Sequence, residues 1–301
     1  MLWIAAKLRI LSCSIGYVPQ FFFHPAKLLL AFALAAPLFL PASGHAQRFG
    51  CTAPAPDNVI TTDRPSFTDS SIVVPCHSQQ MENGFAETSF QNHSGFDAPE
   101  TLFRFGLTNT TEFRFTPPDY YRNYSTGAGF GNGPGDLTIG IKQQLGPVHG
   151  FDVSMVPYLS IPTGTRTLSS HGYDPAFLVP WSRKLSSNWT AAGMFSVLWP
   201  TQGTGRNTTG QASMLFDRQL TTPMDAFIEY NGVFPSFGGP QHIIHFGTSY
   251  KLTAHQQIDF HVGWGLSAAA PDHFIGAGYS FRYDFKRLHL KKEEVVGHGS
   301  H

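Results

Sequence analysis

The feature that most constrains this chain is a period-two alternation of apolar and polar residues along nearly its whole length. The clearest segment lies near the C-terminus, where alternate positions are apolar: Ile275, Ala277, Tyr279, Phe281, Tyr283 and Phe285. Successive side chains of a β-strand point to opposite faces, so this pattern is that of a strand with one apolar face. No stretch after residue 46 sustains helical spacing. The sequence therefore predicts an all-β fold.

Twelve such segments follow one another along the chain. They lie at residues 80–90, 100–108, 110–116, 136–145, 151–161, 174–184, 189–199, 211–220, 225–234, 241–251, 256–266 and 273–285. Most are about ten residues long, which is the length of a tilted strand that crosses a bilayer. An even number of strands is typical of single-chain bacterial outer-membrane barrels.

The connections alternate between two kinds. Short links near residues 109, 146–150, 186–188, 221–223 and 253–255 alternate with long loops at 91–99, 117–135, 162–173, 200–210, 235–240 and 267–272. Tight turns at one end and long loops at the other are typical of a transmembrane antiparallel β-barrel in the bacterial outer membrane, with both termini at the tight-turn end. We therefore predict about 12 strands over residues 80–285.

A soluble secreted β-sandwich is the alternative fold, because it alternates in the same way. Aromatic residues near the strand ends favour the membrane barrel, in which they form interface girdles; they are Trp181, Trp189, Trp199, Tyr230, Tyr250 and Phe285. Pro157 and Pro180 fall inside predicted strands. Each is expected to require a β-bulge.

The N-terminus resembles a cleaved secretory signal. Residues 28–40 are apolar, Lys27 precedes them, and small residues allow a cut after Ala46. The segment is too short for a membrane-spanning helix and contains Pro37. The first 26 residues fit the n-region of a signal peptide poorly, and we expect that the translation start has been assigned too far upstream. Residues 286–301 form a polar tail after the last strand, at the end that the barrel-assembly machinery reads.

Charge is scarce and balanced, with 20 basic and 20 acidic residues making up 13% of the chain. No basic field exists to attract nucleic acid. The low charge content suits a surface that faces outer-membrane lipid. Removal of residues 1–46 also removes one of the three cysteines and leaves Cys51 and Cys76, which in an exported protein form either a disulfide or two free thiols.

Strand parity assigns the charged side chains of the strands to the face opposite the apolar one. We expect them to line the lumen, since Arg or Lys facing lipid costs about 2–4 kcal/mol at the bilayer midplane. They are Arg104, Glu112, Arg114, Lys142, Glu229, Asp259 and Arg282. Such charges either pair with one another and stabilise the barrel or act directly in the passage of a solute.

Residues 47–79 precede the first predicted strand and form an N-terminal periplasmic segment. We expect residues 51–75 to fold into or beneath the barrel as a plug, with Asp63 and Arg64 as inward anchors. A barrel of twelve strands is wider than the eight-stranded kind, whose interior fills with side chains. It can hold a plug and still pass a small molecule.

Several short runs, in order, resemble the family named for the MetA pathway of phenol degradation. The runs are 62–70 (TDRPSFTDS), 82–85 (ENGF), 103–108 (FRFGLT), 135–142 (GDLTIGIK), 160–164 (SIPTG) and 271–281 (PDHFIGAGYSF). The resemblance covers residues 60–285. It implies an outer-membrane barrel that admits a small hydrophobic or aromatic solute by passive or gated diffusion.

Two other functions are weighed against the channel. An outer-membrane acyl hydrolase needs Ser and His together, but His93 and Ser94 are adjacent and would face opposite ways on a strand. His242 and His245 are three apart and also fall on opposite faces, so a shared metal is not expected. No catalytic residue, cofactor or metal is therefore assigned. A structural or adhesive barrel, whose loops bind partners, is the third function considered.

Overall fold

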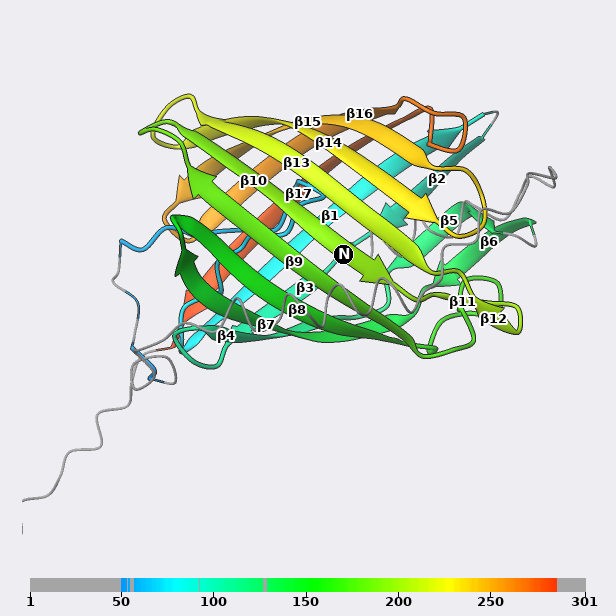
Figure 1. Cartoon of the computed structure of the whole chain (residues 1–301), viewed down its shortest axis with the longest axis horizontal. Coiled ribbons are helices and arrows are strands. Elements are labelled where there is room, and N and C mark those ends of the chain that lie inside the picture. The colour runs from blue at the N-terminus through cyan, green and yellow to red at the C-terminus, as the bar shows by residue number, and fades with distance from the viewer. Residues whose placement is uncertain (1–49, 53, 55–56, 92, 127–128, 286–301) are drawn as a thin grey trace, which may run out of the picture.

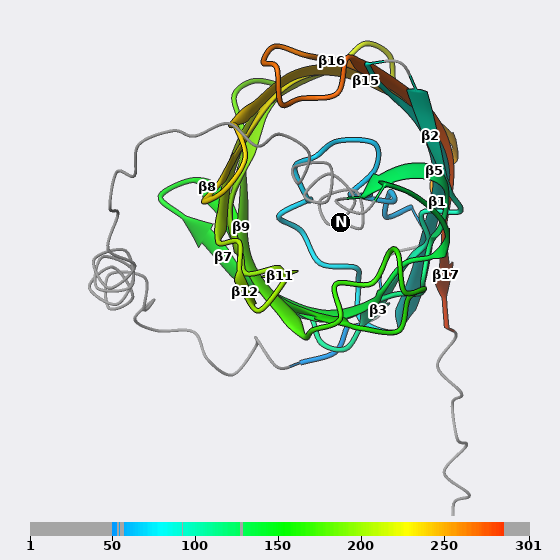
Figure 2. The same ribbon diagram turned by 90° about the vertical axis from the view of Figure 1, so that its right-hand side faces the viewer.

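The computed structural model describes residues 50–285 except 53, 55–56, 92 and 127–128. The described residues form a closed antiparallel barrel of twelve strands, several of them interrupted (Figures 1 and 2). The strand segments are β1 (Ser78–Phe90), β2 (His93–Ala98), β3 (Leu102–Gly106), β4 (Thr111–Thr116), β5 (Tyr120–Thr126), β6 (Gly129–Pro134), β7 (Leu137–Val148), β8 (Phe151–Ile161), β9 (Asp174–Lys184), β10 (Trp189–Leu198), β11 (Thr201–Gln202), β12 (Gly205–Arg206), β13 (Thr209–Gln219), β14 (Met224–Pro235), β15 (Gln241–Thr253), β16 (Gln256–Gly265) and β17 (His273–Asp284).

Closure of the barrel comes from the first and last strands. β1 pairs with β17 along the whole of β17, from Ser78 opposite Asp284 to Ser89 opposite His273. Closure between β1 and β17 leaves neither of these strands as a free edge, as a lipid environment requires. Among the strand segments of this sheet, β6 at the long-loop end pairs on one side only, with β5. The predicted class, an all-β transmembrane barrel, is confirmed.

Three neighbouring barrel strands are each broken into two consecutive segments. The first consists of β2 and β3, the second of β4 and β5, and the third of β6 and β7. The β2–β5 ladder, with Asp97 opposite Tyr121, has the same register as the β3–β4 ladder, with Phe103 opposite Phe115. The breaks fall at residues 99–101, 117–119 and 135–136. The prediction that 91–99 and 117–135 are loops is therefore wrong for most of both segments. Prolines at 99, 117 and 118 interrupt the alternation that the prediction relied on.

The expected bulges at Pro157 and Pro180 are absent. Pairing between β8 and β9 keeps one register from Asp152 opposite Ser182 to Ser160 opposite Asp174, but it omits the pairs opposite Val179 and Pro180. Between β7 and β8 the ladder omits the pairs opposite Val156 and Pro157, and its only register shift lies at Gln144/Gly146. Each proline is thus accommodated by a local gap in the ladder, because a strand can tolerate a missing N–H donor without an inserted residue.

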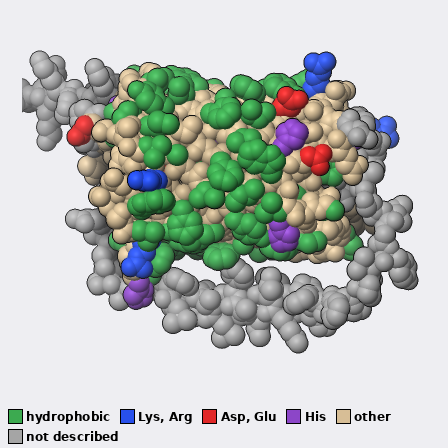
Figure 3. Space-filling view, turned by 90° about the horizontal axis from the view of Figure 1, so that it is seen from above, with side chains coloured by type: hydrophobic (Ala, Val, Ile, Leu, Met, Phe, Trp, Pro, Cys, Tyr) green, Lys and Arg blue, Asp and Glu red, His purple; other side chains and the backbone are tan. Residues whose placement is uncertain are grey.

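The outer surface of the barrel is apolar (Figure 3). Large side chains on the outward positions are strongly exposed, among them Phe195 at 56% and Phe260 at 47%. At the tight-turn end, Arg183 lies over the Phe151 ring and Arg218 over the Trp189 ring. This arrangement suits a lipid-facing band with an aromatic girdle at the interface.

The described residues contain no helix that is both long and apolar enough to cross a membrane. The predicted signal segment at 1–46 and the polar tail at 286–301 lie outside the described residues.

Candidate functional site

The lumen is entered by the segment that precedes β1, drawn in blue inside the barrel in Figure 2. We call residues 58–75 the plug. At the tight-turn end, the Ile60 amide donates a hydrogen bond to the Ala254 carbonyl of the β15–β16 turn (2.7 Å). The chain then runs through the lumen and returns to the same end, where the His77 amide meets the Gly106 carbonyl of β3 (3.3 Å). The plug is therefore a loop whose two ends both lie at the tight-turn mouth.

A disulfide joins Cys51 to Cys76 and closes this loop at its base, with a Cα–Cα distance of 5.4 Å. The arm before the plug is also held to the β3–β4 turn, because the Thr52 amide donates to the Asn109 side chain (2.8 Å). Among the described residues, one group of three side chains has the spacing of metal ligands, Cys51, Cys76 and His77, and its two sulfur atoms are bonded to each other.

We expect the double substitution Cys51→Ala with Cys76→Ala to loosen the N-terminal arm and not the barrel. A cross-link over a loop of this length stabilises by about 3 kcal/mol on the loop-entropy model. Limited proteolysis should cut residues 50–58 in the variant at least tenfold faster, since 3 kcal/mol exceeds the 1.4 kcal/mol of a tenfold change. The midpoint temperature of the heat-modified gel shift, which reports unfolding of the barrel, should be unchanged. Equal proteolysis rates would show that the other contacts hold the arm alone.

Asp63 lies at the centre of a buried charge network in the lumen. Its carboxylate forms ion pairs with Arg114, with Arg104 (3.4 Å) and with Lys142 (3.3 Å), and accepts the Ser70 amide (2.9 Å). Burial alone would raise the pKa of Asp63, but these three cations outweigh it and hold the pKa well below its usual range. Asp63 therefore remains ionised at neutral pH.

Arg104 is fully buried and uses all five of its N–H groups. Its guanidinium donates to the Glu112 carboxylate at 2.9 and 3.0 Å and to Glu82 at 3.0 Å. The remaining N–H groups donate to two plug carbonyls, those of Thr61 (3.0 Å) and Ile72 (2.9 Å). One side chain of β3 thus binds both limbs of the plug and two strands of the wall.

Glu82 and Glu229 bind backbone amides of the plug. Glu82, from β1, accepts the amides of Asp63 (2.9 Å) and Arg64 (3.0 Å). Glu229, from β14, accepts the amides of Phe67 and Thr68, both at 2.8 Å. The His245 imidazole lies 2.8 Å from the same Glu229 carboxylate. The wall therefore fixes the plug backbone from two separate strands, β1 and β14, with β15, β16 and β17 between them.

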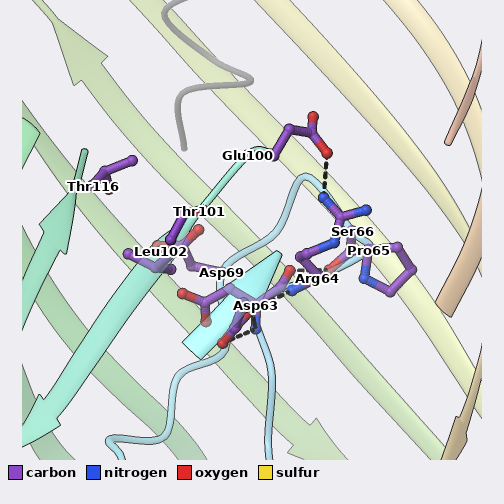
Figure 4. Close-up of a pocket in the computed structure, with 10 residues that line it drawn as sticks. Asp63, Arg64, Pro65, Ser66, Asp69, Glu100, Thr101, Leu102 and Thr116 are labelled. Atoms are coloured by element: carbon purple, nitrogen blue, oxygen red, sulfur yellow. Dashed lines mark hydrogen bonds and ion pairs between the residues drawn. The ribbon is translucent and has the colours of Figure 1, made fainter. Parts of the chain in front are cut away.

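Arg64 points toward Glu100, at the break between β2 and β3 (Figure 4). It forms an ion pair with Glu100, in the gap between β2 and β3, and another with Asp259 of β16 (3.2 Å). Glu100 has a left-handed φ of 46°, which is unusual for a residue with a side chain. A small polar pocket lies between the plug and the broken strands; it is lined by Asp63, Arg64, Pro65, Ser66, Asp69, Glu82, Glu100, Thr101, Leu102 and Thr116.

All the strand charges assigned to the lumen by parity contact the plug. Besides the contacts given above, the Glu112 carboxylate accepts the Val74 amide (2.6 Å), Lys142 donates to the Ser70 carbonyl (2.6 Å), and Arg282 donates to Asn58 (2.7 and 2.8 Å). These charges thus bind the plug in addition to pairing with one another. Sequence reasoning missed Glu82, although its parity with Gln80 marks it, and Glu100, which no periodic pattern marks.

A second part of the lumen wall is apolar. Seven buried residues of β8, β9, β10 and β14 form one cluster: Val156, Tyr158, Ala176, Leu178, Met194, Leu198 and Val233. They face inward, because Ser154 and Ser182, at the same parity of β8 and β9, contact the Ser71 main chain and side chain in the plug. The cluster lies in the half of the barrel nearer the long loops. Sequence reasoning missed it because parity assigned every apolar face to lipid.

The remaining candidate residues are not brought together. His93 and Ser94 are neighbours on β2 and point to opposite sides of it. The His242 ring forms a hydrogen bond with the Tyr230 hydroxyl (2.6 Å) on the outer face of the barrel, whereas His245 lies in the lumen. Neither pair forms a constellation in which Ser and His, or two His, face one site.

The fold and the plugged lumen define the class of protein: this is a bacterial outer-membrane β-barrel. The family model described as "Putative MetA-pathway of phenol degradation" matches residues 62–283. The chain belongs to that family.

Solved structures share the fold. The crystal structure of an outer membrane channel from Pseudomonas putida F1 is 12% identical, with a TM-score of 0.57 over 73% of this chain and 100% of that one. The NanC porin is 9% identical, with a TM-score of 0.50 over 67% of this chain and 98% of that one. No curated protein matches the sequence.

Proposed function

We propose that this protein is an outer-membrane channel for small hydrophobic or aromatic solutes. The observation that carries the proposal is the apolar wall of the lumen, from Val156 of β8 to Val233 of β14. The interior of a barrel that passes hydrophilic solutes is polar. A continuous apolar strip inside the barrel instead offers a surface that a hydrocarbon ring contacts favourably, at roughly 25 cal/mol per Å² of apolar surface removed from water.

The two walls of the lumen have different roles in this proposal. The charged wall, with Arg104 and Glu229, holds the plug against β1, β3, β4 and β14. The apolar wall provides the path along which the solute moves. Passage is gated if the plug must shift and passive if the solute slips beside it. The description of the family, which names phenol degradation, and the channel from Pseudomonas putida F1 agree with this class of function.

The other parts of the proposal concern partners and chemistry. Outer-membrane lipid meets the apolar outer surface, and the barrel-assembly machinery inserts the chain. The lumen gives a path for a solute but brings no nucleophile and base together at His93 and Ser94. We therefore propose no catalysed reaction, in place of the acyl hydrolase alternative.

Uptake across the outer membrane of a porin-deficient Gram-negative host tests the proposal. Expression of the full chain should accelerate uptake of labelled toluene at least several-fold over the empty vector and should change uptake of arabinose little. Phospholipid hydrolysis should be the same for the wild type and His93→Ala. Faster arabinose uptake with unchanged toluene uptake would show a hydrophilic porin, and hydrolysis lost on His93→Ala would show an enzyme. No effect on either solute or on lipid would favour the structural or adhesive barrel.

A further inference from the structure

A row of uncharged polar side chains adjoins the apolar wall of the lumen. Ser196 of β10 lies opposite Gln211 of β13, Gln211 lies opposite Val233 of β14, and Val233 lies opposite Gln241 of β15. Asn231, two residues before Val233 on the same face, belongs to the same row. The four polar side chains are 0–5% exposed. The row therefore borders the apolar cluster through Val233, which belongs to that cluster.

The row contains buried polar atoms that have no hydrogen-bond partner among the described residues. They are Ser196 Oγ, Gln211 Oε1, Asn231 Nδ2 and both amide atoms of Gln241. The Gln211 amide nitrogen donates to Asn231 Oδ1 (2.8 Å), which orients both amides. This orientation leaves the Gln211 carbonyl oxygen and the Asn231 amino group available. Buried polar groups in native proteins are nearly always hydrogen-bonded, so five such atoms along one face need partners that the described residues do not supply, either ordered water or a ligand.

We propose that Ser196, Gln211, Asn231 and Gln241, with the adjoining apolar wall, form a binding subsite for an uncharged solute that has an apolar body and a hydroxyl group. The inference rests on the proposed channel function and specifies its substrate class. The available atoms include donors and acceptors, and all are neutral. A hydroxyl group donates one hydrogen bond and accepts others, so it matches such a set.

A carboxylate fits this row poorly. It only accepts hydrogen bonds, so the carbonyl oxygens of Gln211 and Gln241 would face a group that offers them no proton. The lumen cations Arg104, Arg114 and Lys142 are engaged by Asp63 and Glu112 in the plug network. A buried anion at the row would lack a cation partner. A plain hydrocarbon would leave the polar atoms unpaired, which also disfavours it.

Three solutes with the same carbon skeleton separate these cases: benzyl alcohol, toluene and benzoate. Binding is measured by calorimetry with the full chain in lipid nanodiscs, against empty nanodiscs. The wild type should bind benzyl alcohol about tenfold more tightly than either analogue, as expected for one or two well-made hydrogen bonds. Gln241→Leu should remove most of this preference while toluene affinity changes by no more than about twofold. Gln219→Leu, an exposed glutamine at the tight-turn end of β13, is the matched control and should bind as the wild type does.

Equal affinity for benzyl alcohol and toluene, or an unchanged preference in Gln241→Leu, overturns the subsite. If Gln241→Leu does not give the heat-modifiable gel shift of a folded barrel, Ser196→Ala removes a hydroxyl from the same row with little change in volume, and the same loss of preference is expected. The binding and uptake experiments distinguish failure of the subsite from failure of the channel function. Benzyl alcohol binding without accelerated uptake overturns the channel function, whereas accelerated uptake of toluene and benzyl alcohol without a binding preference overturns only the subsite.

Discussion

Deletion of residues 51–75, combined with Cys76→Ser, should raise the single-channel conductance of the barrel in planar bilayers by about tenfold. A twelve-stranded barrel is too wide for its own side chains to fill, so the plug closes most of the cross-section. Its backbone is hydrogen-bonded to Glu82 of β1 and to Glu229 of β14. Removal of the plug exposes a water-filled lumen whose charged wall favours ion passage.

The control is removal of Gly203 and Thr204, at the tip of the β11–β12 hairpin, which is exposed and lies among the long loops. This change should leave the conductance as it is in the wild type. A milder variant keeps the prediction testable if the deletion does not fold: Thr68→Val removes the hydroxyl that contacts Glu229 and Ser213 (both 2.6 Å). It should give an intermediate conductance or frequent openings. A deletion variant that folds and conducts as the wild type does would show that the plug is not the barrier.

Strand parity predicted which charges enter the lumen, because a period of two fixes the face of every residue once one face is known to meet lipid. Parity could not predict what those charges bind. Asp259 meets Arg64 across 195 positions of sequence, and such a contact depends on barrel closure and not on any local pattern. The sequence therefore singled out Asp63 and Arg64, which form ion pairs with the wall, but not the carboxylate of Glu100, which lies at a break between two strands.

The apolar wall shows the opposite limit. Residues 155–159 and 191–198 are apolar or small at nearly every position, so alternation is lost where both faces of a strand are apolar. In such a run the sequence pattern does not distinguish the environment of Met194 from that of its outward neighbour Phe195. In the structure Met194 is fully buried and Phe195 is 56% exposed. A continuous apolar run in an otherwise alternating barrel is the signal that predicts an apolar lumen, and it can be read only once the barrel itself is established.

Arg104→Met should cause the largest loss of stability of any single substitution discussed for this protein. The side chain is 0% exposed and donates to Glu82, Glu112 and two plug carbonyls. Removal of one partner from a buried ion pair costs about 3–5 kcal/mol, because the remaining charge stays buried without compensation. The midpoint temperature of the heat-modified gel shift should fall markedly. Arg206→Met is the matched control, since Arg206 pairs with Asp174 (2.8 Å) but is 44% exposed, and such pairs contribute about 0–1 kcal/mol.

The cause of the loss can be separated from a general packing defect by a double-mutant cycle with Glu112→Gln. Glu112 also pairs with Arg114 (3.4 Å) and Lys142 (3.8 Å), so Glu112→Gln alone removes a compensated charge and should also destabilise. Combined with Arg104→Met, it relieves the buried charge that the first substitution leaves, and the double variant should be more stable than the sum of the single losses predicts. Strict additivity would mean that the loss does not come from the pair with Glu112 but from the other contacts of Arg104, with Glu82, with Asp63 and with the plug carbonyls. In that case the plug and Glu82, and not the Glu112 pair, would account for the stability that Arg104 provides.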